Sequence, residues 1–354
     1  MRILILAPFP FGESPSQRYR VEHYLKYLSE EKIKYKYASF LTMGGWKIIF
    51  LPKKYLAKIF YVCLGFARRW IQLFTIFKYD YVYVVREAAP IGPPVFEWLI
   101  VKVFRKKLIY DFDDAIWVPV TSEYNKIGRW LKRSSKVSYI CKIAYKVSAG
   151  NKFLAEYAGR YNKNVHIIPT VVDTSELHNR LQDHNTSKIV IGWTGTFSTL
   201  KYLDIVVPSL QRLQGKHDFE FLVIANKDPR LPLKNSRYIQ WTKSNEVEDL
   251  LNMHIGLMPL YDDEISKGKC GFKAIQYMSL GIPALVSPVG VNSEIVDDGV
   301  NGFICNNAGE WEEKMEQLIS DKEMRARMGS KARQKIVEKY SVSSSWPLFK
   351  KLFE

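Results

Sequence analysis

Short apolar runs alternate with amphipathic stretches along the first half of the chain. The apolar runs predict buried β-strands over residues 1–7, 34–40, 79–85 and 107–112. Between the first two runs, residues 18–30 (RYRVEHYLKYLSE) place apolar side chains at helical spacing. Strands separated by helical segments are typical of parallel βαβ units, so this half is expected to form an α/β domain.

The alternation starts again in the second half, after a polar segment that has the composition of a linker. The chain is long for one hydrophobic core, which also favours two domains. We therefore expect a domain over residues 1–173, a linker at 174–187, a second domain over 188–335, and a helical tail at 336–354 that packs back on the first domain. Within the second domain the predicted strands are 188–194, 219–225, 254–260, 283–287 and 302–304.

The net positive charge of the chain comes entirely from its first half. The 354 residues carry a net charge of +16, yet residues 1–173 hold 29 Lys and Arg against 13 Asp and Glu, and the remainder holds 23 of each. An excess in one half favours a surface that meets an anionic partner, either lipid head groups or nucleic acid.

Two acid-free stretches concentrate this charge. Residues 46–78 carry seven cations among Trp, Phe and Leu, and their longest apolar run, Ile59 to Ala67, is too short to span a bilayer. Residues 126–152 form the second stretch. Interfacial helices have this composition, so the first domain is expected to dock on the anionic inner membrane surface. The alternative is a set of helices packed on the sheet with solvated basic edges.

The spacing of the cysteines and the start of the chain favour a cytoplasmic location for the protein. The apolar run at residues 1–7 is shorter than a signal peptide and meets Pro8, so it is interpreted as a strand. The cysteines stand far apart without CxxC spacing, as expected for reduced thiols: Cys63, Cys141, Cys270 and Cys305. We expect a cytoplasmic protein that is peripheral on the cytoplasmic face of the membrane.

Candidate chemistry lies in the loops that follow strands, where doubly wound sheets bind ligands. Gly195 and Thr196 follow the first strand of the second domain, and Gly195 lets the backbone approach a phosphate. Lys201 adds a cation in the helix after this loop. The GxGxxG and GxxxxGKS spacings are absent, so dinucleotide and P-loop sites are not indicated.

A second candidate site lies in the segment KGKCGFKAIQYMSLGIP, residues 267–283. Lys269, Lys273 and Gln276 are four and three residues apart, a spacing that places them on one face of a helix. Two lysines and an amide suit the phosphates and ribose of a nucleoside diphosphate. A solvated basic face is the alternative, but the apolar neighbours favour a binding role.

The first domain offers further strand-end candidates. Arg18 and Arg20 stand in the first turn of the helix after the first strand, an arrangement that favours an anion site. Arg86 and Glu87 follow the strand at residues 79–85, and Asp113 and Asp114 follow the strand at 107–112. These acids could bind sugar hydroxyls or, less readily, a metal ion.

The run KCGFKAIQYMSLGIPALVSPVGVNSEIVDDGVNGF closely resembles the nucleotide-sugar-binding segment of the retaining glycosyltransferases of family 4, which have the GT-B fold. The loop ending in SQRYR, the linker IIPTVVD and the loop GWTGTFSTLKYL support this resemblance. It implies two Rossmann-like domains facing a central cleft, with the acceptor bound by the first and the nucleotide-sugar donor by the second. It implies no cofactor and no bound metal. The implied catalytic residues are Asp113, Asp114, Lys201 and Lys273, and the implied substrate-binding residues are Arg18, Arg86, Glu87, Gly195, Thr196, Lys201, Lys269, Gly271, Phe272, Lys273 and Gln276.

The chain departs from the family pattern at its carboxylates. The family's two glutamates, eight residues apart, would fall on Gly268 and Gln276, and the usual arginine of the first loop falls on Thr196. The expected function is transfer of a sugar to a lipid-linked glycan in cell-surface polysaccharide synthesis. Two alternatives remain open: a GT-B-like protein that binds nucleotide sugars without transfer, and a nucleic-acid-binding protein that uses the basic half.

Overall fold

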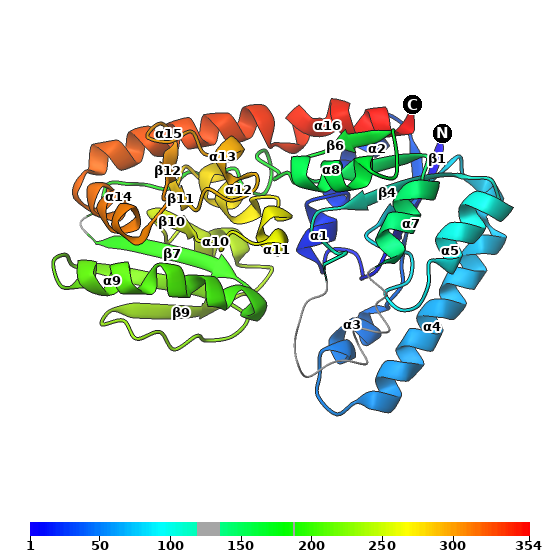
Figure 1. Ribbon diagram of the computed structural model, residues 1–354, viewed down its shortest axis with the longest axis horizontal. Coiled ribbons are helices and arrows are strands. Elements are labelled where there is room, and N and C mark those ends of the chain that lie inside the picture. Colours follow the sequence, from blue (N-terminus) through cyan, green and yellow to red (C-terminus); the bar gives the residue numbers. More distant parts are fainter. Residues whose placement is uncertain (119–134, 187) are drawn as a thin grey trace. The chain divides into compact units, whose positions relative to one another are not determined.

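The computed structural model describes residues 1–118, 135–186 and 188–354, which form two compact units (Figure 1). Unit 1 comprises Met1–Thr170 and Ser345–Glu354, and unit 2 comprises Val171–Ser344. Within the described residues, each unit is built on one parallel sheet of six strands. The predicted α/β class with two Rossmann-like sheets is confirmed. In the same described part of the chain, no helix has both the length and the apolar composition needed to cross a membrane.

The unit 1 sheet has the strand order β2-β1-β3-β4-β5-β6. From β1 the chain adds β2 on one side and β3 on the other. The loops after β1 and β3 therefore flank a topological switch point. The central strands β1, β3 and β4 are buried along almost their whole length, as expected of parallel strands covered on both faces. The bounds are β1 Arg2–Ala7, β2 Lys34–Ser39, β3 Tyr81–Val85, β4 Lys107–Phe112, β5 Lys146–Ala149 and β6 Val165–Ile167.

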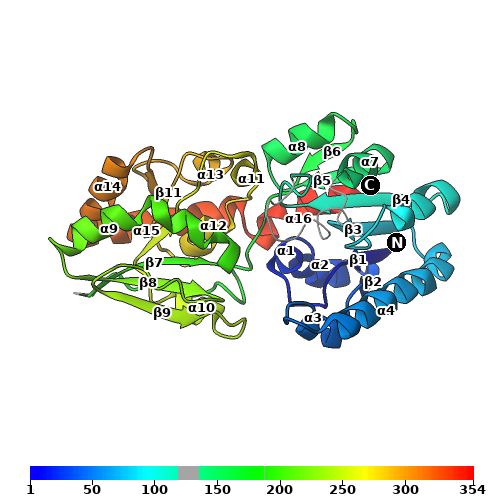
Figure 2. The same ribbon diagram turned by 60° about the horizontal axis from the view of Figure 1, so that its bottom comes forward.

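Helices flank this sheet along its whole width. Figure 2 shows the strand order running from β2, beside α4, to β5 and β6, beside α7 and α8. The ring of Phe349 in α16 stacks on Tyr24 at 4.1 Å, and Ser345–Glu354 belongs to unit 1. The helices are α1 Pro15–Arg18, α2 Leu25–Glu30, α3 Met43–Ile49, α4 Tyr55–Phe74, α5 Val95–Trp98, α7 Lys136–Ile143, α8 Lys152–Gly159 and α16 Val342–Lys350.

The helical stretch expected at residues 18–30 is interrupted. The short helix α1 ends at Arg18, a 3-10 turn follows at Glu22–Tyr24, and α2 starts only at Leu25. The side chain of Arg20 is fully buried against Asp111 of β4, so the backbone leaves the helical path where this arginine turns inward. Helix α1 is a single turn that contains Arg18, whereas Arg20 lies beyond its end, so the expectation that one helical turn carries both arginines was wrong.

The unit 2 sheet has the strand order β12-β11-β10-β7-β8-β9. Its switch point lies between β7 and β10, which pair directly. The loops after these two strands contain the segments that the sequence singled out around Gly195 and Lys273. The bounds are β7 Ile189–Gly195, β8 Phe219–Ala225, β9 Ser236–Gln240, β10 Ile255–Met258, β11 Ala284–Val286 and β12 Gly302–Ile304.

The core of unit 2 forms where α9 and α14 pack on the sheet around the fully buried indole rings of Trp193 and Trp311. The helix that carries Lys273, α12, packs on β10, β11 and α15. The helices are α9 Val207–Gln214, α10 Glu246–Leu250, α11 Glu264–Lys267, α12 Phe272–Ser279, α13 Asn292–Ile295, α14 Ala308–Ser320 and α15 Lys322–Lys339, with a 3-10 helix at Phe197–Ile205.

The structure contains three strands that the sequence pattern does not predict. Strands β6 and β9 lie at sheet edges and are partly exposed. Strand β9 carries mostly polar side chains and β6 has only three residues, so neither contains a long apolar run. Strand β5 has four residues and lies inside the second basic stretch, at residues 126–152. Part of that stretch, with Arg129, Lys132 and Arg133, lies outside the described residues.

Candidate functional site

The unit 2 candidate site lies at the carboxyl ends of β7 and β10. The backbone N–H of Thr194 donates to the hydroxyl of Tyr277 in α12 at 2.9 Å, which fixes α12 to β7. The ammonium group of Lys273 lies over the ring of Trp193, 5.6 Å from its centroid. Lys273 and the β7 loop are therefore held at one place in the fold.

Lys201 belongs to the same region. It lies in the 3-10 helix after β7, where the hydroxyl of Thr199 caps the backbone of Thr196 in a capping box. Tyr261, which follows β10, donates its hydroxyl to the carbonyl oxygen of Lys201 at 3.3 Å. Both strand ends at the switch point thus contribute to positioning the backbone of this exposed lysine.

The two glycines of this site are required by packing. A Cβ on Gly195 would lie 2.3 Å from the ring of Trp193 and 2.7 Å from the hydroxyl of Thr199. Gly271 has φ +66°, and a Cβ there would lie 2.0 Å from Ile295. The close packing of Trp193 against the loop accounts for Gly195 without a ligand, although the sequence argument invoked only approach to a phosphate.

The three polar residues of the second motif do not share a helix. Helix α12 begins at Phe272, so Lys269 precedes it in the connection from α11 and the prediction of one common helical face was wrong. Gln276 is in the helix and is buried, and its amide donates to the carboxylate of Glu246 at 3.3 Å. The half-buried Phe272 occupies the first turn of α12.

Glu246 is a candidate that the sequence argument did not find. It starts α10, just after β9, and is itself buried. The apolar pattern does not predict β9, so it does not mark the carboxyl end of this strand as a place for polar candidates. The signal that could have indicated it is the run of Asn245, Glu246, Glu248 and Asp249, which is typical of a helix start.

In unit 1, a cluster of charged groups lies at the carboxyl ends of β3 and β4. The guanidinium of Arg86 donates from Nε and Nη2 to one oxygen of Asp113, at 2.9 and 2.7 Å, and from Nη2 to Asp114 at 2.8 Å. Arg86 has φ 58°, a left-handed conformation that costs energy for a non-glycine residue. The structure therefore brings together three of the sequence-predicted residues of this unit.

Burial and the neighbouring charges have opposite effects on the pKa values of this cluster. Burial raises the pKa of Asp113, while the positive charge of Arg86 acts in the opposite direction. Burial also disfavours the charged form of Arg86, but Asp113 and Asp114 raise its pKa overall. Among the described residues, no group of three or more His, Cys, Asp or Glu side chains is arranged to hold a metal ion.

The remaining predicted residues of unit 1 have structural partners. The carboxylate of Glu87 pairs with the ammonium of Lys136, which also donates to the carbonyl oxygen of Ala89 at 3.0 Å. Arg18 is buried and donates to the hydroxyl of Tyr19 at 3.2 Å. These contacts hold residues that follow β1 and β3 in place.

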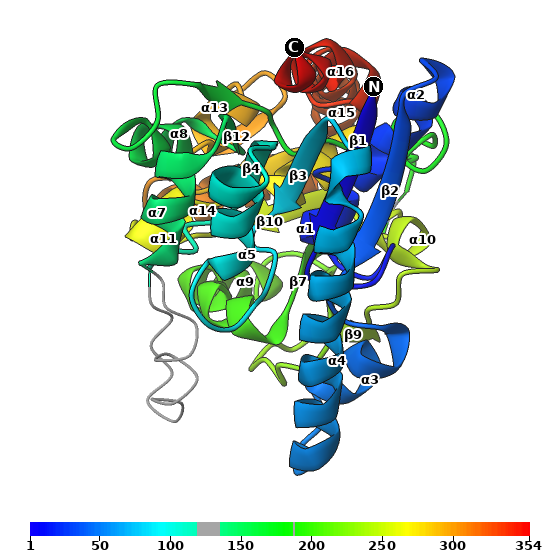
Figure 3. The ribbon, with the colours of Figure 1, turned by 90° about the vertical axis from the view of Figure 1, so that its right-hand side faces the viewer.

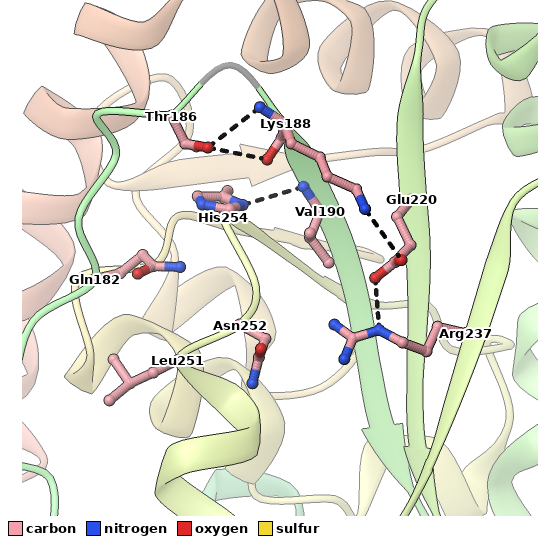
Figure 4. A pocket seen from close by; sticks show the side chains of 9 residues that line it. All are labelled: Gln182, Thr186, Lys188, Val190, Glu220, Arg237, Leu251, Asn252 and His254. Carbon is pink, nitrogen blue, oxygen red and sulfur yellow. Dashed lines mark hydrogen bonds and ion pairs between the residues drawn. The ribbon is translucent and has the colours of Figure 1, made fainter.

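Unit 2 also has a polar cavity of about 570 Å³ at the opposite edge of its sheet (Figure 4). Its lining comes from the amino-terminal ends of β7 to β10, where Arg237 donates to Glu220 at 2.7 Å. The N–H of Val190 donates to Nδ1 of His254 at 3.1 Å, and burial lowers the pKa of His254 to about 4. Ligands of such sheets bind at the carboxyl ends of the strands, so this cavity is not the expected donor site.

Comparison with known families decides how this geometry is interpreted. Residues 174–335 match the family model for glycosyl transferases group 1, and this range includes all the candidate residues of unit 2. Unit 2 belongs to the group 1 glycosyl transferases. The resemblance to family 4 is thereby confirmed. The matched range starts within the segment that the sequence suggested as a linker, and Arg333 ties that segment to α12 through the carbonyl oxygens of Thr174 and Ser279.

Solved structures show the same fold over the full chain. The Anabaena protein HepE, in complex with UDP and glucose, has a TM-score of 0.67 at 16% identity, with 99% of each chain covered. Sucrose-phosphate synthase from Thermosynechococcus elongatus has a TM-score of 0.70 at 12% identity, with 100% of this chain and 99% of that chain covered. The predicted GT-B fold is confirmed by this full-length similarity.

The curated relatives of this chain are distant. A capsular polysaccharide biosynthesis glycosyltransferase, CapM of Staphylococcus aureus, is 22% identical over 49% of this chain and 48% of its own length. An uncharacterized glycosyltransferase of Methanocaldococcus jannaschii is 26% identical over 61% of each chain. The chain thus spans about half to three fifths of the length of these relatives.

Proposed function

We propose that the protein transfers a sugar from a nucleotide-diphosphate sugar to a lipid-linked glycan, with retention of configuration at the sugar. The observation that carries this proposal is the placement of Lys201 and Lys273 at the β7/β10 switch point of a group 1 domain. Binding of UDP by HepE, a protein of the same fold, supports a nucleoside diphosphate as the ligand.

In the proposed reaction the donor diphosphate is the leaving group. The acceptor hydroxyl oxygen forms a bond to the anomeric carbon, and the bond from that carbon to the phosphate oxygen breaks. The electron pair goes to the diphosphate, and the hydroxyl proton passes to a phosphate oxygen. Lys201 and Lys273 stabilise the charge that develops on the diphosphate, so the chain itself supplies the cations in place of a bound metal.

The ribose and the sugar have separate partners in this proposal. The amide of Gln276 and the carboxylate of Glu246 form a hydrogen-bonded pair that suits the ribose hydroxyls. Asp113, held in place by two donors of Arg86, suits hydroxyl groups of the transferred sugar. Asp114 accepts one of those donors and is the more exposed of the two carboxylates.

The site of action is proposed to be the cytoplasmic face of a membrane, where lipid-linked acceptors are anchored. The excess positive charge of residues 1–173 supports contact with anionic lipids. Synthesis of capsular polysaccharide or a related cell-surface glycan is the proposed setting, and the distant relative CapM supports it.

A thermal-shift panel of nucleoside diphosphates and nucleotide sugars tests the donor site. We expect at least one of them to stabilise the protein, and Lys273→Ala to weaken its binding by about 10- to 150-fold, since a hydrogen bond to a charged group contributes about 1.5–3 kcal/mol. Lys314→Ala is the matched control, because Lys314 in α14 also lies over an aromatic ring, that of Phe303. If no nucleotide stabilises the wild type, or if both variants respond as it does, the donor site is wrongly placed.

A transfer assay separates this enzyme from an inactive binding protein. Sugar transfer to lipid-linked acceptors in membrane extracts is expected from at least one donor sugar whose nucleotide shifts the melting temperature. Nucleotide binding without transfer from any donor would support the inactive alternative. Salt-sensitive RNA or DNA binding without any nucleotide response would support the nucleic-acid alternative.

A further inference from the structure

Helix α4 of unit 1 presents an apolar stripe to solvent. The exposed residues of this helix, which is described in full, recur every three or four positions, so they lie on one face. Leu56, Phe74 and Tyr55 are the most exposed of its large hydrophobic side chains, at 85%, 81% and 70%. The stripe, here named the α4 ridge, consists of Tyr55, Leu56, Ile59, Phe60, Cys63, Ala67, Trp70, Ile71 and Phe74.

The opposite face of α4 fixes the orientation of the ridge. The guanidinium of the buried Arg69 donates to the carbonyl oxygens of Ala7 at 2.7 Å, Ala38 at 3.0 Å and Ala88 at 2.5 Å. Gly65 lies so close to the ring of Phe40 that a Cβ would approach within 2.5 Å. Because three strand ends hold Arg69, α4 cannot rotate to bury the ridge without breaking these contacts.

The ridge also extends beyond the sheet that supports it. Figures 1 and 3 both show the amino-terminal end of α4 projecting away from the strands of unit 1. The connection that leads into it adds Phe50, 70% exposed, and Leu51, 46% exposed. Soluble proteins seldom expose a continuous apolar surface of this kind unless it binds a partner.

Exposed lysines flank the ridge at both ends. Lys47, Lys53 and Lys54 precede α4, Lys78 follows it, and residues 46–78 contain no acid. Lysines at the start of α4 are unfavourable for the helix itself, because a helix dipole favours anions at its amino-terminal end. Lys54 occupies the N-cap position, where its side chain makes no cap hydrogen bond. An anionic partner would offset this local repulsion.

The charge pattern favours a lipid surface over a second copy of the chain. Pairing two ridges, parallel or antiparallel, would bring lysines of one copy near lysines of the other with no intervening acid from this segment. An anionic bilayer instead accepts apolar side chains below its head groups and lysines at the head-group level. Lys58 and Arg68 are half-buried along the sides of the helix, an arrangement that suits a helix lying in the plane of the surface.

We infer that the α4 ridge and its flanking lysines dock unit 1 on an anionic lipid bilayer, with α4 lying in the interface. The inference deepens the proposed function, since it names the surface that brings the protein to a lipid-linked acceptor. It does not depend on which nucleotide sugar the protein uses.

Vesicle flotation with the full chain tests the inference. Vesicles of phosphatidylcholine with phosphatidylglycerol should bind the wild type, and pure phosphatidylcholine should bind it more weakly. Leu56→Glu combined with Phe74→Glu should lower the affinity by more than about tenfold, because two apolar side chains no longer enter the interface. Leu181→Glu is the matched control, since Leu181 is an exposed leucine, at 59%, that belongs to unit 2.

The charge contribution is tested separately. Lys53→Glu with Lys54→Glu should weaken binding to the anionic vesicles, whereas Lys331→Glu with Lys339→Glu, two exposed lysines of α15, should not. Absence of wild-type binding, or equal binding by the ridge variant, would overturn the inference. A dimer in analytical ultracentrifugation that the ridge variant abolishes, without vesicle binding, would replace the bilayer with a second copy.

The nucleotide response separates this inference from the proposed function. The ridge variant should keep the melting temperature of the wild type and its shift with a nucleoside diphosphate, which also shows that it is folded. Lys273→Ala should lose that shift and still float with anionic vesicles. In one outcome the wild type shows no melting shift with any nucleotide and yet floats with anionic vesicles, while the ridge variant does not float. That result would contradict the proposed donor site and support the docking surface.

Discussion

The side-chain amide of Gln276 in α12 donates a hydrogen bond to the carboxylate of Glu246 in α10, 3.3 Å away. Both residues are buried, at 2% and 5% exposure, although 30 positions separate them in the chain. A glutamate at position 276, as in the family pattern, would place a second carboxylate against Glu246. The neutral amide at position 276 thus fits the carboxylate that α10 supplies.

Gln276→Glu is therefore expected to destabilise unit 2 by about 1–3 kcal/mol, because two buried carboxylates would repel each other and one would have to take up a proton. Exchange of the two groups in Glu246→Gln with Gln276→Glu restores one amide and one carboxylate. We expect the double variant to recover most of the lost thermal stability in a melting experiment. If the double variant is no more stable than Gln276→Glu, the hydrogen bond between positions 246 and 276 does not account for the loss of stability.

Gly271→Ala should both destabilise the protein and weaken the nucleotide response. The new Cβ would meet Cδ1 of Ile295 at 2.0 Å, so either this side chain or the start of α12, just before Lys273, must shift. Gly299→Ala is the matched control: it has a similar φ, +72°, but nothing lies within 4 Å of its Cβ position. The free energy of unfolding of Gly299→Ala should fall only by the cost of the left-handed conformation, about 1–2 kcal/mol. Equal effects of the two substitutions would contradict this account.

Much of the site was predictable because strand ends can be recognised from apolar runs. Arg86, Asp113, Lys201 and Lys273 each follow a run that forms a buried strand. Glu246 was missed because β9, which precedes it, is a partly exposed edge strand with the sequence SRYIQ. Such a strand has no apolar run by which it could be recognised in the sequence.

Pairwise contacts could not be predicted in the same way. Arg86 and Asp113 lie 27 residues apart, and only the direct pairing of β3 with β4 brings them within 2.7 Å. The inward turn of Arg20 toward Asp111 likewise depends on strands from distant parts of the chain. The burial of Gln276 depends on α10, which the sequence analysis did not place.

Stability of unit 2 should fall as the pH drops below about 6.5, through the titration of His254. Burial, with smaller effects from His184 and Arg325, lowers the pKa of this imidazole from 6.5 to about 4. The unfolded chain therefore binds the proton first, so the stabilisation is complete above pH 6.5 and is lost progressively toward pH 4, by about 2–3 kcal/mol. The melting temperature of His254→Asn should fall less than that of the wild type between neutral pH and about pH 5. Parallel curves would rule out His254 as the titrating group.

Asp113→Asn should reduce sugar transfer more than Asp114→Asn does. Asp113 accepts two donors of Arg86 with one oxygen, and Asp114 accepts one. Loss of the Asp113 charge leaves Arg86 paired with Asp114 alone and allows its loop to shift, which we expect to lower kcat/KM by more than about tenfold. The nucleotide-induced melting shift should be unchanged in both variants, because unit 2 is intact. A lost shift in Asp113→Asn would mean that the cluster acts on donor binding.

Unit 1 is completed by residues that the ribosome adds after all of unit 2. Phe349 and Leu352 are fully buried within unit 1, and the indole of Trp346 donates to Glu31 at 2.8 Å. Until residues 345–354 leave the exit tunnel, Tyr24 and Tyr83 lack the aromatic ring that covers them in the folded protein. The first-made unit is thus the last to be finished, and the emerging chain carries an incomplete core throughout synthesis of unit 2.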